Sequence, residues 1–436
     1  MKISVFGLGY VGTVSAACLA DSGHHVVGLD ANAGKLELIA AGSSPIVEKD
    51  VDGMIASAVA DGGLQVTGDV TEAVANTDLS LICVGTPSLP NGNIDLAHVK
   101  TVCAQIGAAI KAKGGLHVVA MRSTMLPGSM GDVVIPTLEQ HSGLKAGQDF
   151  GVCINPEFLR EGTAVFDYRN PPKTVIGESD TRAGDVLAEL YVDLDAPLIR
   201  TGIETAELAK YVDNTWHALK VSFANEVGNI SKSLGIDSHA VMDIFCQDTK
   251  LNLSSYYLKP GFAFGGSCLP KDVRALTYKA KSLDLDLPVL NSILPSNQRQ
   301  VEKALNMVEG AGSRKIGVLG FAFKAGTDDL RESPVVELVE RLLGKGYEIK
   351  LYDRNVTLSR LTGANRDFAL RHVPHISALM VNSVDDVLEH AQTIIVGNKA
   401  EEFSGVLDRL RSGQTLVDLV RISDSTSGPQ YDGICW

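Results

Sequence analysis

The chain reads KISVFGLGYVG at residues 2–12. A short apolar run of β type is followed by glycines at the first, third and sixth positions of GLGYVG, and then by a helical pattern. Glycines at this spacing let the backbone approach a pyrophosphate, which lies at the positive end of the following helix dipole. The next strand-like run, residues 25–29, ends at Asp30, where a dinucleotide-binding fold places a carboxylate on the ribose hydroxyls. The stretch therefore predicts a Rossmann-type strand, turn and helix that binds a dinucleotide.

The carboxylate at position 30 also indicates which dinucleotide is bound. It would repel the 2′-phosphate of NADP, so the sequence favours NAD. Lys35 follows shortly after and is placed to contact the adenosine end of the cofactor. The alternative is a tight turn whose glycines are coincidental.

The alternation of strands continues beyond the first turn. Apolar runs at residues 79–84, 116–121 and 150–154 read as further strands, the first of them buried and parallel. Ligands bind outside the carboxyl ends of such strands, so we expect Thr86, Thr124 and the polar segment after residue 154 to face the cofactor crevice. For each threonine the alternative is a helix cap or a turn hydroxyl.

Length and composition limit the class of protein. A chain of 436 residues suggests about three domains, and a formal net charge of -13 argues against a nucleic-acid partner. There is no signal-peptide pattern and no apolar run of about 18 residues, so we expect no membrane partner and a cytoplasmic protein. The seven cysteines show no CxxC or other metal-ligand spacing, which predicts neither a disulfide framework nor a metal site.

A long helical pattern occupies about residues 203–235. Its apolar residues recur at spacings of three and four and form one stripe: Leu208, Val212, Trp216, Leu219, Phe223, Val227 and Ile230. Another arc, about 80° wide, presents single hydrogen-bonding groups of different kinds: Glu207, Lys210, Asn214, His217 and Asn225. Solvated helix faces are usually filled with Glu and Lys pairs. We therefore expect this polar stripe to be functional, the alternative being a solvated face.

Residues 264–272, FGGSCLPKD, place Cys268 in a flexible loop flanked by charge. A structural cysteine is usually buried like a small hydrophobe, whereas a nucleophilic one needs access and nearby positive charge. By itself the loop leaves both interpretations open. The preceding segment, from residue 247, is rich in aromatic residues and glycine and reads as a substrate-wrapping loop. The alternative there is a surface loop packed on its own aromatics.

From residue 314 the strand series starts again. KIGVLG at residues 315–320 mirrors KISVFG at residues 2–7, and the later runs at 347–351, 393–397 and 416–419 continue the series. The second copy lacks GxGxxG, so we expect it to hold a nucleotide, but not a dinucleotide in the same pose. Lys324 and Arg331 supply positive charge at its strand ends, the alternative being ordinary salt bridges within loops.

These patterns together predict an α/β protein. It consists of two Rossmann-like doubly wound domains joined by a long central helix and a helical dimerisation segment. The expected boundaries are residues 1–202 for the NAD-binding domain, 203–300 for the central helical domain with the thiol loop, and 301–436 for the second nucleotide-binding domain.

Two nucleotide domains with a thiol between them suggest oxidation of a nucleotide-linked substrate. Oxidising an alcohol needs only a base and a positioned nicotinamide. Oxidising the resulting aldehyde is easier after a thiolate has added to it, because the thiohemiacetal can yield a second hydride and become a thioester. Water then releases the acid, so we expect two NAD molecules to be reduced per substrate.

Four motifs resemble those of the UDP-glucose/GDP-mannose dehydrogenase family: GLGYVG at 7–12, NPEFLRE at 155–161, FGGSCLPKD at 264–272 and FKAGTDDLR at 323–331. The resemblance covers nearly the whole chain. Residues 246–262 and the ending GICW at 433–436 are most similar to members that act on GDP-mannose. The resemblance implies four-electron oxidation of GDP-mannose to GDP-mannuronate, as in alginate precursor synthesis, with UDP-glucose oxidation as the alternative.

The resemblance also implies roles for individual residues. Cys268 is the implied nucleophile, and Lys210 and Asn214 donate hydrogen bonds to the developing oxyanion. Asp272 is the implied base for thioester hydrolysis, and Thr124 and Glu161 are further candidates for holding water. The implied NAD contacts are Gly7, Gly9, Tyr10, Val11, Gly12, Asp30, Lys35, Thr86, Thr124, Lys271 and Arg331. The implied contacts with the nucleotide sugar are Glu161, Lys210, Asn214, His217, Asn225, Tyr256, Tyr257, Lys259, Phe262, Gly265 and Lys324.

One position departs from the family pattern, which has arginine where this chain has Lys259. Lysine keeps the charge but loses the planar fork that suits phosphate. The family also implies a homodimer, or a larger oligomer, built on the long helix, in which a loop of one subunit completes its neighbour's site. Two other classes remain as rivals: a nucleotide-binding regulator with an inactive site, and a single-step hydroxyacid dehydrogenase. The second leaves the thiol loop and the second nucleotide domain unexplained.

Overall fold

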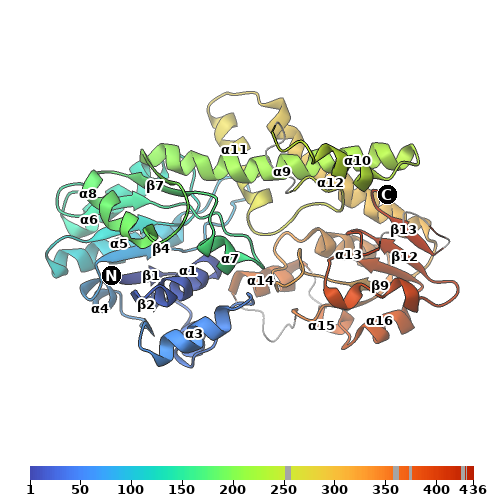
Figure 1. The fold of residues 1–436 in the computed structure, drawn as a ribbon, viewed down its shortest axis with the longest axis horizontal. Coiled ribbons are helices and arrows are strands. Elements are labelled where there is room, and N and C mark those ends of the chain that lie inside the picture. The colour runs from blue at the N-terminus through green and yellow to red at the C-terminus, as the bar shows by residue number, and fades with distance from the viewer. Residues whose placement is uncertain (251–256, 357–362, 373–375, 424–427, 429) are drawn as a thin grey trace. The chain divides into compact units, whose positions relative to one another are not determined.

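A computed structural model describes residues 1–250, 257–356, 363–372, 376–423, 428 and 430–436 of the chain. The chain divides into two compact units, Met1–Asp213 and Asn214–Trp436. Each unit contains one β-sheet with helices around it (Figure 1). The predicted α/β class with two Rossmann-like sheets is confirmed.

The sheet of the first unit has eight strands in the order β3-β2-β1-β4-β5-β6-β7-β8. Neighbouring strands are parallel except for β6 and β7. β1 pairs with β2 on one side and β4 on the other, so the strand order reverses there, and ligands bind at the carboxyl ends beside such a reversal. The strands are β1 (Lys2–Phe6), β2 (His25–Leu29), β3 (Leu64–Val66), β4 (Leu79–Ile82), β5 (Val118–Met121), β6 (Gly151–Ile154), β7 (Thr174–Glu178) and β8 (Leu198–Thr201).

The central strands are buried on both faces, which explains their continuous apolar sequences. β4, β5 and β6 are buried at every position, as expected for parallel strands that carry helices on both sides. The predicted strand at 25–29 coincides with β2. The predicted strand at 116–121 is shorter at its amino end, because Leu116 is exposed and the ladder begins at Val118.

The helices of the first unit connect these strands. α1 is buried along most of its length, which explains why it consists largely of small and apolar residues. The helices are α1 (Tyr10–Asp21), α2 (Ala33–Ala40), α3 (Val51–Ala60), α4 (Val70–Ala75), α5 (Ala97–Lys113), α6 (Ile135–Ser142), α7 (Ala164–Arg169) and α8 (Thr181–Ala188). A π-helical turn, Met130–Val134, precedes α6, and a 3-10 turn, Glu189–Tyr191, follows α8.

The sheet of the second unit has five parallel strands in the order β10-β9-β11-β12-β13. This order repeats β2-β1-β4-β5-β6 of the first sheet, so the predicted restart of the strand series is confirmed. The strands are β9 (Lys315–Leu319), β10 (Glu348–Tyr352), β11 (Thr393–Val396), β12 (Thr415–Asp418) and β13 (Tyr431–Gly433).

The helices of the second unit are α10 (Ser238–Phe245), α11 (Leu269–Ser282), α12 (Pro288–Gly310), α13 (Pro334–Gly344), α14 (Gly363–His372), α15 (Ile376–Leu379) and α16 (Val384–His390). Two 3-10 turns, Glu401–Phe403 and Leu407–Arg409, lie between β11 and β12. The core of this unit includes side chains of α12, α13 and the strands, among them Val301, Leu338 and Ile395. The segment before α11 contributes Phe262 and Ala263 to this core.

The long helix α9 (Ile203–Ser233) begins in the first unit and ends in the second. Its polar stripe is buried: Glu207, Lys210, Asn214 and Asn225 are at most 6% exposed, whereas His217 is only partly buried. Four residues of its apolar stripe are exposed: Leu208, Val212, Trp216 and Phe223 are 42%, 54%, 44% and 45% exposed. Leu219 and Val227 of the same stripe are partly buried against other apolar side chains. Burial excludes a solvated face for the four buried polar residues.

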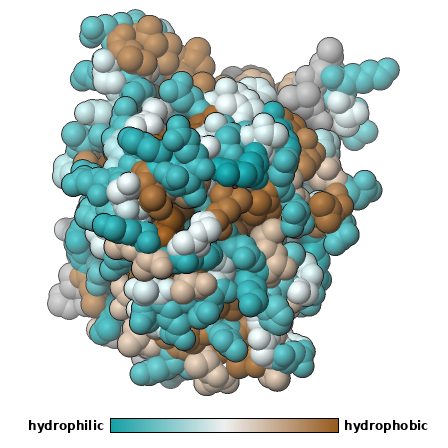
Figure 2. All heavy atoms as spheres, turned by 90° about the vertical axis from the view of Figure 1, so that its left-hand side faces the viewer, coloured by the Kyte–Doolittle hydropathy of each residue, from teal (hydrophilic) through white to brown (hydrophobic). Residues whose placement is uncertain are grey.

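Among the described residues, no helix combines the length and the apolar character that crossing a bilayer requires. Figure 2 shows one face of the molecule, which is largely hydrophilic and carries separate hydrophobic patches.

Candidate active site

The glycine turn of the first unit connects β1 to α1. A Cβ on Gly12 would lie 1.8 Å from the carbonyl oxygen of Gly7, so only glycine allows the helix to approach the turn this closely. Gly9 caps α1 without a side-chain hydrogen bond, and a Cβ there would meet nothing within 4 Å. The amino end of α1 therefore faces open space, and its backbone N–H groups fit a pyrophosphate. The residues present thus fit a dinucleotide.

Asp30 lies directly beside this turn. Its Oδ2 accepts a hydrogen bond from the Leu8 backbone N–H at 2.8 Å and lies 3.0 Å from the Lys35 ammonium. Its Oδ1 accepts a hydrogen bond from the Asn32 N–H at 2.9 Å. The structure therefore brings together the two residues that the sequence assigned to the adenosine end of the cofactor.

The two predicted threonines also meet. The Thr86 hydroxyl, after β4, donates a hydrogen bond of 2.8 Å to the Thr124 carbonyl oxygen, after β5. Both residues follow the carboxyl ends of neighbouring parallel strands, as predicted. This contact ties the two strand ends together at the edge where ligands bind in such sheets.

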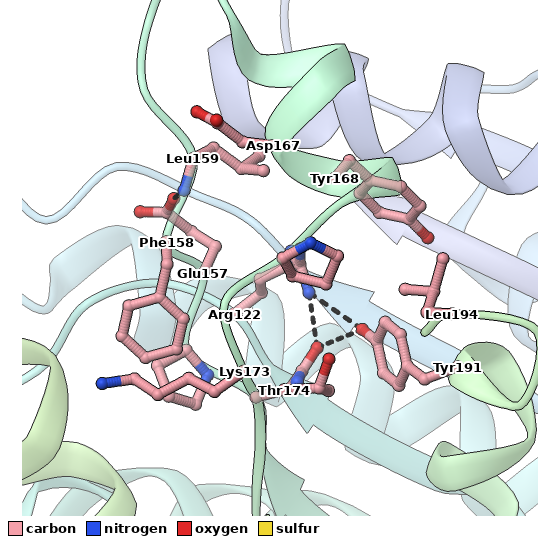
Figure 3. Close-up of a pocket in the computed structure, with 13 residues that line it drawn as sticks. Arg122, Glu157, Phe158, Leu159, Asp167, Tyr168, Lys173, Thr174, Tyr191 and Leu194 are labelled. Atoms are coloured by element: carbon pink, nitrogen blue, oxygen red, sulfur yellow. Dashed lines mark hydrogen bonds between the residues drawn. The ribbon is translucent and has the colours of Figure 1, made fainter. Parts of the chain in front are cut away.

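The loop after β6 is held by buried polar contacts. The Arg122 guanidinium donates to Asn155 Oδ1 and, at 2.9 Å, to the Tyr191 hydroxyl, and these residues line a small cavity (Figure 3). Two ammonium groups lie near the Phe158 ring: that of Lys173 is 4.8 Å from the ring centroid, and that of Lys210 is 5.4 Å from it. Such cation–π contacts hold the loop against the neighbouring lysines.

Glu157 is a site residue that the sequence reasoning did not single out. One of its carboxylate oxygens lies 3.0 Å from the Lys210 ammonium, and both side chains are at most 6% exposed. Burial by itself would raise the pKa of Glu157, but the Lys210 ammonium and the Leu159 N–H outweigh burial and lower it. The residue was present in the NPEFLRE motif, yet nothing in the sequence paired position 157 with position 210.

The thiol loop lies in the second unit. All seven cysteines belong to the described part of the chain, and Cys268 alone among them is exposed. Cys268 immediately precedes α11, so its side chain is at the amino end of that helix. Backbone N–H groups at such a position stabilise a negative charge. The exposure and position favour the interpretation of Cys268 as a reactive thiol over that of a structural one.

Packing explains the glycine before this thiol. A Cβ on Gly265 would lie 2.3 Å from the Glu332 carbonyl oxygen and 2.6 Å from Cδ of Pro334. The guanidinium of Arg274, one turn into α11, also pairs with the Glu332 carboxylate. Gly265 is therefore needed for the loop to lie against the segment around residue 332, whatever the substrate contacts.

Asp272 is placed one helical turn after Cys268. Its Oδ2 accepts a hydrogen bond of 2.6 Å from the Asn214 amide. Its Oδ1 lies 2.8 Å from the Lys271 ammonium without hydrogen-bond geometry, and no described group donates a hydrogen bond to it. The carboxylate is 1% exposed. One oxygen is thus held by Asn214, while the other is buried against the Lys271 ammonium.

The residues assigned to the nucleotide sugar fall into several environments. The His217 and Tyr257 rings stack with centroids 4.5 Å apart. Asn225 is engaged with the loop itself, accepting from the Gly261 N–H at 2.9 Å and donating to the Phe262 carbonyl oxygen at 3.2 Å. These contacts position the loop, so any substrate contact by Asn225 comes in addition to a structural role.

The remaining assigned residues differ in their surroundings. Lys259 and Lys324 are exposed, and the Arg331 guanidinium forms an ion pair of 2.6 Å with Asp329. Val11 is partly buried against the core of the first unit. Tyr256 lies outside the described residues. Thr124, Glu161 and Lys210 belong to the first unit, whereas Asn214, Cys268 and Asp272 belong to the second.

Comparison with known proteins covers the whole chain. Residues 1–195 match the NAD binding domain of the UDP-glucose/GDP-mannose dehydrogenase family, residues 204–299 its central domain, and residues 317–425 its UDP binding domain. The GDP-mannose 6-dehydrogenase of Pseudomonas aeruginosa is 53% identical over 436 residues, with 100% of both chains covered.

Two solved structures are also similar to this chain. A ternary complex of GDP-mannose dehydrogenase from Pseudomonas aeruginosa is 53% identical, with a TM-score of 0.58 and 100% of both chains covered. A UDP-glucose dehydrogenase from the hyperthermophilic archaeon Pyrobaculum islandicum is 35% identical, with a TM-score of 0.90 and coverage of 100% of this chain and 98% of that one.

Proposed function

Because the chain belongs to the UDP-glucose/GDP-mannose dehydrogenase family, we propose that it oxidises GDP-mannose to GDP-mannuronate through covalent intermediates on Cys268. The family makes the protein an NAD-dependent nucleotide-sugar dehydrogenase. GDP-mannose is favoured over UDP-glucose because the GDP-mannose 6-dehydrogenase of Pseudomonas aeruginosa is 53% identical to this chain, whereas the UDP-glucose dehydrogenase of Pyrobaculum islandicum is 35% identical. We assign the product, GDP-mannuronate, to the synthesis of alginate precursors.

The observation that carries the covalent route is the exposed thiol of Cys268 with the Asp272 carboxylate one turn later. Bound NAD accepts the hydrides that the sugar carbon loses in its two oxidations. Cys268 adds as a thiolate to the aldehyde carbon, forming a carbon–sulfur bond and an alkoxide that becomes a thiohemiacetal. After the second oxidation the sugar is held as a thioester on Cys268.

Other residues stabilise and then release this intermediate. The Lys210 ammonium and an N–H of Asn214 donate hydrogen bonds to the oxygen that carries negative charge in each tetrahedral species. The Asp272 carboxylate takes a proton from the water that attacks the thioester, and the thiolate of Cys268 leaves. Thr124 and Glu161 help to hold this water.

Separate sets of residues are assigned to the cofactor and to the nucleotide sugar. We assign cofactor binding to Gly7, Gly9, Tyr10, Val11, Gly12, Asp30, Lys35, Thr86, Thr124, Lys271 and Arg331, and we assign nucleotide-sugar binding to Glu161, Lys210, Asn214, His217, Asn225, Tyr256, Tyr257, Lys259, Phe262, Gly265 and Lys324. Residues 1–202 hold the cofactor, residues 203–300 supply the thiol, and residues 301–436 hold the nucleotide. The protein works in the cytoplasm.

The exposed apolar stripe of α9 supports a homodimer. Leu208, Val212, Trp216 and Phe223 lie at helical spacing on one side of the helix and are each more than 40% exposed. Apolar side chains that recur on one helical face are typical of helix–helix contacts. Light scattering coupled to gel filtration tests this assignment, and a monomeric mass at micromolar concentration would contradict it.

The function is tested with purified protein, NAD and either GDP-mannose or UDP-glucose. We expect a clear preference for GDP-mannose and two NADH formed per sugar. The Cys268→Ala variant should form no acid, whereas the control variant Cys246→Ala, at a partly buried cysteine, should retain activity. A preference for UDP-glucose would overturn the substrate assignment. One NADH per sugar, or undiminished acid formation by Cys268→Ala, would overturn the covalent route.

A further inference from the structure

Glu48, in the segment between α2 and α3, carries a carboxylate at which three parts of the first unit meet. The residue is 8% exposed. Its Oε2 accepts hydrogen bonds from the Tyr10 hydroxyl and, at 2.6 Å, from the Gly162 backbone N–H. Its Oε1 accepts a hydrogen bond of 3.1 Å from the Ala164 N–H. One side chain therefore joins the start of α1 to the segment between β6 and α7.

The first of these partners belongs to the cofactor-binding turn. Tyr10 is the first residue of α1, directly after Gly9. Its hydroxyl also lies 3.1 Å from the Gly162 N–H, so Tyr10, Glu48 and Gly162 are in mutual contact. Burial raises the pKa of Tyr10, and the hydrogen bond and negative charge of Glu48 raise it further. The phenol therefore stays protonated and acts as a donor to Glu48.

The other partners flank Glu161, which we assign to substrate and water. On one side, the backbone N–H of Arg160 donates to Asp167 at 2.9 Å, and the Arg160 guanidinium pairs with the same carboxylate. On the other side, Gly162 has a φ of 84° and directs its N–H to Glu48. Glu161 thus lies between two residues whose backbone N–H groups are hydrogen-bonded. On the Gly162 side, the hydrogen bond leads to Glu48 and, through Glu48, to Tyr10 of the cofactor turn.

The chemistry of the position favours a carboxylate over an amide. All three neighbours donate: one hydroxyl and two backbone N–H groups. A carboxylate offers acceptors only, whereas a glutamine would replace one acceptor oxygen with an NH₂ group. Ala164 is also the first residue of α7, whose capping residue Thr163 makes no side-chain cap, so Glu48 supplies a negative charge at that helix end.

We propose that Glu48 is a positioning residue that sets the place of Glu161 relative to the cofactor-binding turn. In this role Glu48 contacts neither the cofactor nor the nucleotide sugar, and it acts through Tyr10 and Gly162. This role rests on the proposed function, because it requires Tyr10 at the cofactor and Glu161 at the substrate. Neither partner is close to Glu48 in sequence, so the role could be inferred only from the fold.

The test compares the full-length wild type with Glu48→Ala, Glu48→Gln and Tyr10→Phe. Steady-state kinetics give kcat and the KM of the nucleotide sugar, and fluorescence titration gives the Kd of NADH. We expect Glu48→Ala to lower kcat/KM for the sugar by about 10- to 100-fold, since misplacing a reactive group has effects of that size. The Kd of NADH should change by less than about threefold, because the partners of Glu48 are the Tyr10 hydroxyl and the N–H groups of Gly162 and Ala164, not the N–H groups of the glycine turn or Asp30.

Two further comparisons separate positioning from general stability. Asp180→Ala removes another carboxylate that accepts a backbone N–H at a helix start, that of α8, and serves as the control. It should lower the melting temperature and leave the kinetics unchanged. Tyr10→Phe should cause a smaller loss than Glu48→Ala, and the double variant should be no worse than Glu48→Ala alone, because the two residues act as one unit.

A value of kcat/KM within twofold of wild type for Glu48→Ala would overturn the proposal. Equal losses in sugar and NADH affinity would also overturn it, since they would indicate general damage. If Glu48→Ala does not fold, Glu48→Gln and Tyr10→Phe decide by the same criteria. All ratios are taken with whichever nucleotide sugar the wild type oxidises, so a preference for UDP-glucose would sink the substrate assignment and leave the role of Glu48 testable.

Discussion

The Asn214 amide donates a hydrogen bond of 2.6 Å to the buried carboxylate of Asp272. The backbone N–H of Asp272 in turn donates to the Cys268 carbonyl oxygen at 2.9 Å, within the first turn of α11. Thiol and carboxylate are therefore held by the same helical turn, and the carboxylate is oriented by a residue of α9. A base positioned in this way suits the hydrolysis of a thioester on the neighbouring cysteine.

Asp272→Asn removes this base and should slow acid release by about 10²- to 10⁴-fold, the usual contribution of general base catalysis. Thioester formation does not need the base, so the sugar should accumulate on Cys268. Intact-protein mass spectrometry after mixing with GDP-mannose and NAD should detect the adduct. The double variant Cys268→Ala/Asp272→Asn is the control and should show none. Full turnover by Asp272→Asn would contradict the role of Asp272.

The buried Glu157–Lys210 pair predicts strongly non-additive stability effects. Glu157→Gln leaves the Lys210 ammonium buried without its carboxylate, which typically costs about 3–5 kcal/mol of unfolding free energy. Lys210→Met leaves the opposite charge and should cost a similar amount. The double variant removes both charges and should recover part of the loss. Urea unfolding of the four proteins measures the coupling, and additive losses would show that the two side chains do not stabilise each other.

Gly265→Ala should disturb the thiol loop through packing. The added Cβ would lie 2.3 Å from the Glu332 carbonyl oxygen, so the loop or its neighbour must move. We expect a loss of about 1–3 kcal/mol of unfolding free energy and a lower kcat. Gly261→Ala is the matched control, because the nearest atom to a Cβ there is 3.5 Å away. Equal behaviour of the two variants in thermal melting and in turnover would refute this explanation of Gly265.

The Asp237–Arg421 pair predicts how stability depends on pH. Arg421 donates hydrogen bonds of 2.7 and 3.0 Å to Asp237 and holds the pKa of that carboxyl at about 2, below its ordinary 3.8. Since the folded-state pKa is the lower one, the pair stabilises the fold above about pH 4 and loses this effect as the pH falls toward 2. Asp237→Asn should therefore show a shallower fall in melting temperature over that range.

Circular dichroism melts at several pH values measure this difference. Asp408→Asn, at an exposed carboxylate, is the control and should follow the wild type. Parallel curves for wild type and Asp237→Asn would show that the ion pair does not contribute to the acid dependence of stability.

The elements of the fold were largely predictable because their signals are local. The glycine turn, the strand at 25–29 with Asp30 after it, and the restart of the strand series near residue 314 were each read from spacing and apolar runs. The local pattern does not predict β3, β7, β8 or β13, and it misplaces strand ends, such as the exposed Leu116. Local sterics and burial on both faces of a parallel sheet decide these features.

The orientation of α9 shows where local pattern stops being informative. Spacing identified its two stripes, but it did not reveal that four residues of the polar stripe are buried and four of the apolar stripe are exposed. A polar stripe can face a protein interior as well as an apolar one, provided that its side chains form hydrogen bonds or ion pairs there. For Glu207 the hydrogen-bond partners are the backbone N–H groups of Gly128 and Met130, at 2.7 and 2.9 Å, which lie far away in sequence.

The sequence by itself determined the glycine turn, the repeated strand series and the loop with Cys268 one helical turn before Asp272, because each depends on residues within a few positions of one another. Only the tertiary structure decided that Glu157 pairs with Lys210, that Asn214 orients Asp272, and that Glu48 joins Tyr10 to Gly162. These pairings arise because the sheets and helices bring distant segments together, and a side chain's own residue type does not specify which distant partner it will meet.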